Sequence, residues 1–235
     1  MITDTYATFS QYKHLINIDT SYRCLLKCPS CTRQKKWGIE QIKRAKDMPK
    51  EDLIKILDFF TGVNLCGQIS DPIYHPDFLD LLKIIEEKNK IVTVSTNGSG
   101  KTPQWWEKAY SYCKGNIRWV FGVDGIDNKS ELYRVGSNFK NVWEAMRLGK
   151  KLGHPIVWQY IVFEYNEKDI PKAIEISKKE GFTLDIVHTN RVHNQKTNRF
   201  NYGVSQASEK FTRKKVKSRK RYNETNELKA WYDKW

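Results

Sequence analysis

The segment Leu15-Ile-Asn-Ile-Asp-Thr-Ser-Tyr-Arg-Cys-Leu-Leu-Lys-Cys-Pro-Ser-Cys31 joins a strand-like run to three closely spaced cysteines, Cys24, Cys28 and Cys31. Their C-x3-C-x2-C spacing indicates three ligands to one metal centre. A [4Fe–4S] cluster normally takes four thiolates, so three thiolates leave one iron open to a ligand from outside the protein. The segment therefore predicts a metal centre with an unfilled position at the end of the first strand.

The same cysteines are compatible with a structural zinc site, for which His14 is one candidate fourth ligand. A second C-x2-C pair or a nearby Cys/His pair would strengthen that interpretation, and the sequence has neither. A zinc site also would not explain why the cysteine segment opens a long series of strands and helices. These two points favour the cluster.

The chain has 235 residues, enough for one large domain or for a domain and a tail. It contains no apolar run near 18 residues and no signal-peptide pattern, so we expect a soluble, cytoplasmic protein with no membrane contact. Five cysteines, three of them clustered, are unlike a secreted disulfide framework and typical of a metal site in a reducing compartment. The isolated Cys66 and Cys113 are expected to be small buried residues.

The net charge of +14 is unevenly distributed. Residues 191–235 hold 13 Lys and Arg against 4 Asp and Glu, a net charge of +9, which leaves +5 for residues 1–190. Within the basic part, Thr212–Arg221 has seven cations in ten positions, a density that resists burial without an anionic partner. We therefore predict a core domain at 1–190 and a basic tail at 191–235.

The tail shows no clear strand–helix pattern, but aromatic residues are interspersed among its cations. Cations for phosphate and rings for stacking make it a candidate nucleic-acid surface. A docking arm for an acidic peptide and a segment that closes the open side of the core are the alternatives. The aromatic residues are Phe200, Tyr202, Phe211, Tyr222, Trp231, Tyr232 and Trp235.

Apolar runs rich in Val and Ile alternate with helix-period segments from His14 onward, which predicts βα units around a parallel sheet. An α/β protein with six such strands follows from this pattern. The strands are predicted at Leu15–Asp19, Val63–Cys66, Ile91–Ser95, Ile117–Val123, Ile156–Phe163 and Thr183–His188.

Two of the intervening helices show apolar residues at i, i+3, i+4 spacing, over Phe78–Ile85 and Ile170–Ser177. Their boundaries carry chemical signals as well. Ser137 is placed to cap the helix that begins near Phe139. Gly181 follows a helix end, where a left-handed residue is often required.

Six βα units form either a partial barrel or an open doubly wound sheet. Both arrangements place a ligand site at the carboxyl ends of the strands. Polar residues gather at those positions: the cysteines follow the first strand, Gly67–Pro72 the second, Ser95–Gly98 the third and Asp124–Gly125 the fourth. This convergence predicts the site.

These motifs together resemble the radical S-adenosylmethionine (SAM) enzymes, over roughly residues 12–190. The resemblance implies a partial (β/α)6 barrel in which Cys24, Cys28 and Cys31 hold a [4Fe–4S] cluster and SAM chelates the fourth iron. It also implies that one electron cleaves SAM to methionine and a 5′-deoxyadenosyl radical, which takes a hydrogen atom from the substrate. An external electron donor such as flavodoxin or ferredoxin would reduce the cluster.

The resemblance implies SAM contacts after strands two and three. Where the family usually has Gly-Gly-Glu-Pro, this chain has Leu65-Cys-Gly-Gln-Ile-Ser-Asp-Pro72. Gly67 would let the backbone approach the ligand, and Asp71 would accept a hydrogen bond from the SAM amino group; a simple Asp-Pro turn is the alternative. Ser95 and Asn97 would contact the ribose or methionine end of SAM, and a plain Asn-Gly turn is the alternative there.

Four further positions resemble family residues at and after strands four and five. Asp124 matches a strand-end acid of the family, and Arg134 aligns with an arginine that can pair with the SAM carboxylate through two parallel hydrogen bonds. A solvated loop arginine is the alternative for Arg134. Gln159 and Asn166 resemble residues of the fifth strand and the loop after it, and are expected in the pocket.

The chain departs from the family in two places. Ser30 stands where many members have an aromatic residue that contacts the adenine, and no cysteine follows Cys113 to form a cysteine-rich extension. The resemblance is to the core of the peptide-modifying branch, and we expect a single cluster. The substrate is a peptide or protein, or a nucleotide or nucleic acid. A nucleic-acid-binding protein with a structural metal site is the alternative function.

Overall fold

The computed structural model describes residues 15–113, 115–187, 189, 191–194, 199–202 and 220–222, with only the backbone given for Leu15 and for the last three segments. Nine strands and ten helical segments lie within them. The strands are β1 Leu15–Ile18, β2 Gly62–Cys66, β3 Ile91–Thr96, β4 Ile117–Gly122, β5 Ile156–Ile161, β6 Thr183–Val187, β7 Arg191–Asn194, β8 Arg199–Tyr202 and β9 Lys220–Tyr222. The α-helices are α2 Lys36–Arg44, α3 Lys50–Phe59, α4 Phe78–Glu87, α5 Pro103–Ser111, α6 Phe139–Lys151 and α7 Ile170–Glu180, and the short 3-10 helices are η1 Thr32–Gln34, η2 Pro72–Tyr74, η3 Asp127–Leu132 and η4 Glu167–Asp169.

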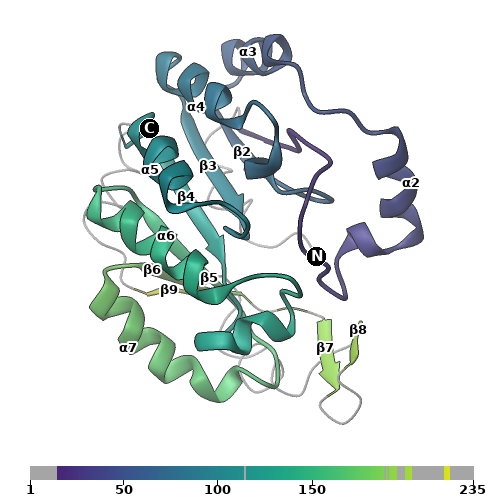
Figure 1. Cartoon of the computed structure of the whole chain (residues 1–235), viewed down its shortest axis with the longest axis vertical. Helices are drawn as coiled ribbons and strands as arrows, with labels where there is room; N and C mark the ends of the chain where they lie inside the picture. Colours follow the sequence, from purple (N-terminus) through teal and green to yellow (C-terminus); the bar gives the residue numbers. More distant parts are fainter. Residues whose placement is uncertain are drawn as a thin grey trace.

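Strands β1 to β6 form one parallel sheet in sequential order. Because strand–helix–strand connections are right-handed, a sheet with this order places its helices on one face. Figure 1 shows α4, α5, α6 and α7 following one another along the same side of the strands. The order does not reverse anywhere, so the doubly wound alternative is wrong. The expected partial (β/α)6 barrel is confirmed, with its sheet open rather than closed.

All six predicted strands are present, with boundaries that differ by no more than two residues from those expected in the described chain. Gly181 adopts the predicted left-handed conformation, with φ of 70°, after α7. The predicted cap of α6 is wrong by one residue. Asn138, and not Ser137, caps this helix, since its side-chain oxygen accepts a hydrogen bond from the Asn141 backbone N–H at 3.0 Å.

Successive side chains of the sheet alternate between two environments. On β4, Ile117, Trp119 and Phe121 are fully buried against the helices, whereas Arg118 and Gly122 line a cavity on the opposite face. The same period of two holds on the neighbouring strands, as the geometry of a strand requires. The core therefore lies between sheet and helices, and the other face is free to carry polar groups.

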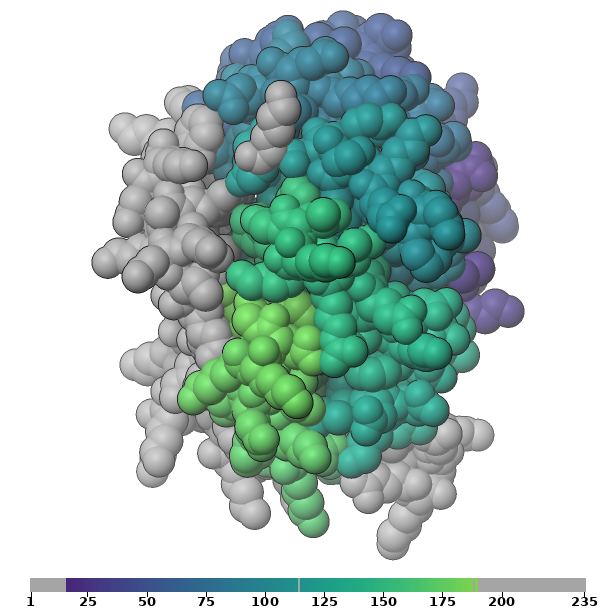
Figure 2. Space-filling model, turned by 60° about the vertical axis from the view of Figure 1, so that its left-hand side comes forward, coloured from purple at the N-terminus to yellow at the C-terminus, as the bar shows by residue number. Residues whose placement is uncertain are grey.

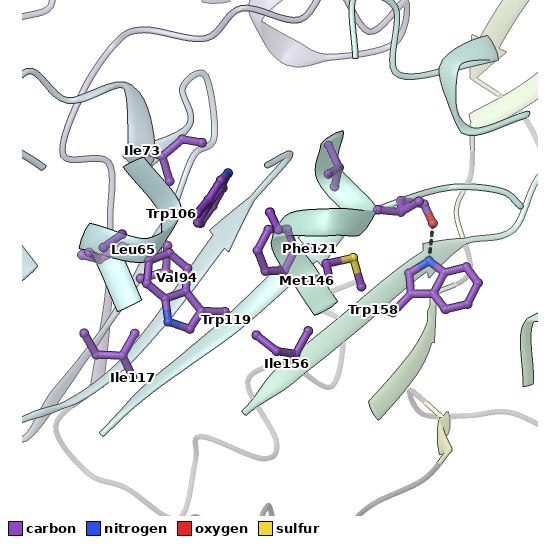
Figure 3. Packing of buried hydrophobic residues seen from close by; sticks show 14 of the residues in the cluster. Leu65, Ile73, Val94, Trp106, Ile117, Trp119, Phe121, Met146, Ile156 and Trp158 are labelled. Atoms are coloured by element: carbon purple, nitrogen blue, oxygen red, sulfur yellow. Dashed lines mark hydrogen bonds between the residues drawn. The ribbon is translucent and has the colours of Figure 1, made fainter. Parts of the chain in front are cut away.

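Aromatic side chains fill the layer between sheet and helices. Trp106 of α5 lies 5.7 Å from Trp119 of β4, measured between ring centroids, and Trp143 of α6 lies 4.8 Å from Trp158 of β5. Figure 3 shows these strand residues pointing toward the helices, with the Trp158 indole nitrogen donating to the Val123 carbonyl at 2.7 Å. Each buried indole adds a large apolar area to the core, and this rigid layer positions the strand ends. In the space-filling view the colours of the described residues pass from blue at the top, through teal, to green at the bottom (Figure 2).

Three short strands occur in the predicted tail, where the sequence shows no clear strand–helix pattern. β7 and β8 form an antiparallel pair, and β9 pairs antiparallel with β6 at the edge of the main sheet. The remaining residues of 191–235, including most of the basic run Thr212–Arg221, lie outside the described residues. The domain boundary at residue 190 stays a prediction.

Among the described helices, none combines the length and the apolar character that crossing a membrane requires.

Gly149 is placed in α6 where its neighbours leave no room for a side chain. A Cβ there would lie 2.7 Å from Ile156 Cδ1 and 2.7 Å from Tyr110 Cζ. Gly149→Ala should lower the free energy of unfolding by roughly 1–2 kcal/mol, because overpacking outweighs the better helix propensity of alanine. Urea denaturation measures this. Lys140→Ala, at an exposed site of the same helix, should stay within about 0.5 kcal/mol of the parent, and a stabilised Gly149→Ala variant would contradict the packing.

Candidate functional site

A cavity of about 430 Å³ lies on the inner face of the sheet and reaches the carboxyl ends of its strands. All three clustered cysteines line it. Six of the eight residues expected to contact SAM line it as well: Gly67, Asp71, Ser95, Asn97, Arg134 and Gln159. The other two, Asp124 and Asn166, are fully buried and do not belong to the lining. Residues from five separate loops and strands are thus brought to one place.

The cysteine segment is held by hydrogen bonds to the loops on both sides of it. Lys27 N–H donates to the Val135 carbonyl at 2.9 Å, and Asp71 N–H donates to the Arg23 carbonyl at 2.9 Å. The Arg33 guanidinium adds a bond to the Ile69 carbonyl at 2.8 Å. These contacts fix a segment that has no regular structure of its own between β1 and η1.

The carboxylate of Asp71 accepts four hydrogen bonds from the protein. Oδ1 accepts from Ile73 N–H at 3.2 Å and from Thr96 Oγ1 at 2.8 Å, and Oδ2 accepts from both the backbone N–H, at 2.6 Å, and the side-chain amide of Asn97. A carboxylate has about four acceptor positions, so these bonds fill them. Burial raises the pKa of Asp71 to about 6, although the hydrogen bonds that the carboxylate accepts lower the pKa. The contact between Asp71 and the SAM amino group stays a prediction; the arrangement favours a positioning role.

Asn97 links this carboxylate to the first cysteine. Its side-chain nitrogen also donates to Cys24 Sγ at 3.7 Å. Hydrogen bonds to cluster sulfurs are one of the means by which a protein sets a cluster's reduction potential. Asn97 therefore contacts one of the three clustered cysteines, whereas its contact with SAM stays a prediction.

The turn after β2 depends on the absence of a side chain at Gly67. A Cβ there would lie 1.7 Å from the Ser70 carbonyl oxygen, so the close backbone approach is made by the loop itself. The Asp19 carboxylate, at the end of β1, accepts from Gln68 N–H at 3.0 Å and from Ser70 Oγ at 2.5 Å. Asp19 was missed from the sequence, although its position at a strand end was a usable signal.

Arg134 reaches the cavity from the segment after η3. Its Nε donates to Asp124 Oδ2 at 2.7 Å, and its guanidinium lies over Gly122, where a Cβ would come within 2.5 Å of Nη2. Burial lowers the pKa of Arg134, but the charge of Asp124 and the hydrogen bond to it outweigh burial and hold this pKa above its usual value. The side chain is 16% exposed, so its outer edge is presented to the cavity.

Asp124 and Asn166 form a buried network behind this arginine. Asp124 Oδ1 accepts from the Ile161 N–H at 2.9 Å, and its backbone carbonyl accepts from the Asn166 side chain at 2.9 Å. Asn166 also closes its own loop, because its Oδ1 accepts from Phe163 N–H at 2.7 Å. Direct contacts of these two residues with SAM stay predictions; the structure shows them positioning Arg134 and the end of β5.

The two isolated cysteines differ. Cys113 is part of the core on the helical side, and its Sγ donates to the Ala109 carbonyl at 3.2 Å, as expected of a small buried residue. Cys66 is half-buried and lines the cavity instead, and burial raises the pKa of its thiol to about 11.

A row of polar side chains deeper in the cavity was also missed from the sequence. It comprises Asn17, Asn64, Thr93 and Arg118, and Asp185 of β6 lines the same cavity. The signal was present, since each is a polar residue inside an otherwise apolar strand at the period of two that marks one face.

A family model described as the radical SAM superfamily matches residues 18–176. The chain therefore belongs to the radical SAM superfamily. Members of this superfamily are enzymes that use a [4Fe–4S] cluster and SAM, which defines the cofactors of this protein.

Related proteins are distant in sequence and mostly longer. PqqA peptide cyclase from Granulibacter bethesdensis is 19% identical over 168 residues, which cover 70% of this chain and 44% of the relative. Streptococcus suis SuiB bound to its precursor peptide SuiA is 16% identical with a TM-score of 0.61, over 77% of this chain and 42% of that one. The anSMEcpe structure with bound AdoMet and Cp18Cys peptide is 18% identical with a TM-score of 0.58, over 82% and 55%. The chain thus spans less than half of the first two relatives, and these likenesses show the shared fold.

The residues around the cavity fit both cofactors. The three clustered cysteines are free thiols that line one cavity, and thiolates are the ligands that a [4Fe–4S] cluster takes. Within the described residues, no three Cys, His, Asp or Glu side chains, the clustered cysteines included, converge on one point as metal ligands do, so the fit to the cluster rests on the shared segment and cavity of the cysteines. His14, the candidate zinc ligand, lies outside them. The Arg134 guanidinium provides a planar donor for a carboxylate such as that of SAM.

Asp71→Asn should lower the free energy of unfolding by about 2–4 kcal/mol. The new amide nitrogen would face the donors of Thr96 or Asn97, which leaves buried donors unsatisfied. Chemical denaturation checks this, with Asp77→Asn as the matched control because the Asp77 side chain is 53% exposed. Equal stability of the two variants would show that the Asp71 carboxylate does not hold the loops together.

Proposed function

We propose that this protein cleaves SAM reductively at a single [4Fe–4S] cluster and that the resulting 5′-deoxyadenosyl radical takes a hydrogen atom from a substrate bound in the same cavity. The observation that carries the proposal is the convergence of Cys24, Cys28 and Cys31 with Asn97 and Arg134 on one cavity of an open (β/α)6 barrel.

The proposal gives each residue a distinct task. The three thiolates hold the cluster, and Asn97 donates a hydrogen bond to one of them. Arg134, fixed by Asp124, is oriented to bind the SAM carboxylate. Ser95 and Gln159 line the wall beside it and offer hydroxyl and amide groups to the rest of the ligand. Asp71, Asp124 and Asn166 keep these groups in position.

The substrate within this proposal is a peptide or protein, or a nucleotide or nucleic acid. Support for peptides comes from the relatives, which include a peptide cyclase and a structure with a bound precursor peptide. Those relatives are mostly longer than this chain, and the likeness covers the shared core.

An external electron donor such as flavodoxin or ferredoxin completes the proposed reaction. The segment from 22 to 50, which carries the cysteines and α2, has nine Lys and Arg against two Asp and Glu. Charge of one sign around the cluster segment would steer an acidic protein to it. Lys27 and Lys36 are exposed on this segment.

Anaerobically reconstituted protein should contain about four irons per chain and, with dithionite and SAM, should release 5′-deoxyadenosine. Cys24→Ala should lose this release because the cluster loses a ligand. Cys113→Ala, which removes a cysteine on the helical side of the sheet, should keep it. Chromatography of the products with iron and sulfide analysis measures both. About one zinc without iron or sulfide, or equal product from both variants, would contradict the proposal.

The basic tail supports a second candidate activity, binding of nucleic acid, which includes the alternative of a nucleic-acid-binding protein with a structural metal site. Its seven cations in Thr212–Arg221 would contact phosphates. The affinity for RNA or DNA in filter binding should then fall steeply as salt rises, because each phosphate contact releases counterions. No affinity, or an affinity insensitive to salt, would remove this role of the tail.

A further inference from the structure

Cys66 ends β2 with its side chain on the cavity face of the sheet. The strand alternates before it, since Leu65 is fully buried in the core shared with the helices and Asn64 lines the cavity. Cys66 lines the cavity as well, and its thiol forms no hydrogen bond with any described residue. Cys113, by contrast, donates to the Ala109 carbonyl. Cys66 is therefore a thiol without a structural partner.

The thiol lies between the proposed SAM contacts and a deeper pair of polar residues. In the strand register Cys66 pairs with Ser95 of β3, and Gly67 follows it in the chain; both neighbours are expected SAM contacts. Asn64 is two residues deeper on β2 and pairs with Thr93 of β3. Two residues of a strand correspond to about 7 Å. A substrate that extends from the deeper pair toward SAM would pass Cys66.

Two polar atoms of the deeper pair point to such a ligand. Asn64 is 8% exposed and Thr93 is 4% exposed, and neither Asn64 Oδ1 nor Thr93 Oγ1 has a hydrogen-bond partner among the described residues. Folded proteins pair nearly all of their buried polar groups. Both residues line the cavity, and both oxygens can accept a hydrogen bond from an N–H group. Peptides and nucleotides, the substrate classes proposed above, carry such groups.

The cluster would leave Cys66 as the one S–H group of the cavity. The chain has five cysteines, of which the three clustered ones would bind iron as thiolates. Cys113 belongs to the core on the helical side of the sheet. Burial, and after it the charge of Asp19, raises the pKa of the Cys66 thiol to about 11, so the sulfur keeps its proton at neutral pH.

A thiol in this place would react with a radical formed beside it. An S–H bond is weaker than the C–H bonds of peptides and nucleotides, so a thiol readily gives a hydrogen atom to a carbon radical. An enzyme that handles radicals has to exclude competing reactions of this kind or make them part of its own reaction. Cys66 is on the cavity wall and is not excluded.

We propose that Cys66 gives a hydrogen atom to the substrate radical and so completes the reaction. The 5′-deoxyadenosyl radical first breaks a substrate C–H bond and keeps that hydrogen as 5′-deoxyadenosine. The S–H bond of Cys66 then breaks, a new C–H bond forms at the substrate carbon, and a thiyl radical remains on the sulfur. This inference rests on the proposed function, which supplies the radical.

The thiol is restored by one electron from the external donor and one proton from solvent. Each turnover therefore takes two electrons, one to cleave SAM and one to reduce the thiyl radical. The hydrogen that the product gains comes from solvent through the sulfur, because S–H groups exchange with water and C–H groups do not.

The test is SAM cleavage in D2O without added substrate, so that the 5′-deoxyadenosyl radical is the carbon radical that meets the thiol. Cluster-loaded full-length protein is supplied with SAM and dithionite in buffer free of small thiols, and mass spectrometry measures deuterium in the 5′-deoxyadenosine. The product should carry deuterium taken from the S–D group of Cys66. This transfer should continue beyond a single turnover, because dithionite and solvent restore the thiol.

Two variants assign the transfer to Cys66. Cys66→Ser keeps the size of the side chain but replaces S–H with a stronger O–H bond, so its 5′-deoxyadenosine should lose the deuterium. Cys66→Ala should give the same loss, which makes the result independent of how one variant folds. Cys113→Ser makes the matched substitution on the helical side of the sheet and should keep the deuterated fraction of the parent.

Three results would overturn the role of Cys66 and leave the proposed function standing. They are 5′-deoxyadenosine without deuterium from the parent protein, an equal deuterated fraction from Cys66→Ser, and a transfer that stops after one turnover. The last would show a thiol that is damaged and not restored. Failure of the parent protein to form any 5′-deoxyadenosine would instead overturn the proposed function, and this inference with it.

Discussion

A side chain on a β-strand can point to only one of two faces, and the whole site depends on this constraint. On β4, Trp119 and Phe121 are committed to the layer shared with the helices, so Arg118 and Gly122 are committed to the cavity. A parallel sheet inside a closed α/β layer would be apolar on both faces. Here one face carries polar residues that line the cavity, without weakening the core on the other face.

Two buried carboxylates join neighbouring strand ends to the loops that follow them. Asp71 joins the loop after β2 to the end of β3, and Asp124 joins the end of β4 to Arg134 and to β5. Each is surrounded by hydrogen-bond donors from different parts of the chain. Since an unpaired buried carboxylate is costly, these loops are held to one arrangement, and the groups that line the cavity are preorganised.

The strands and the location of the site could be predicted from sequence because both follow from local patterns. Apolar runs marked the strands, and cysteine spacing with polar strand ends marked the rim. What could not be predicted is the direction of individual side chains within the rim. Asp124 and Asn166 are polar residues that follow strands, as several cavity residues do. Their side-chain oxygens nevertheless accept hydrogen bonds from backbone N–H groups. The row of polar side chains deeper in the cavity was overlooked for another reason, because a residue such as Thr93 inside a strand resembles an ordinary β-branched residue.

The pairing of β9 with β6 affects the tendency of the protein to self-associate. An exposed outer strand of a parallel sheet presents unpaired N–H and C=O groups that recruit strands from other molecules. Lys220–Tyr222 occupies those groups along Leu184–Ile186. Lys220–Tyr222 thus also hinders self-association through this edge. A chain shortened before residue 220 would expose an aggregation-prone edge and would lose positive charge.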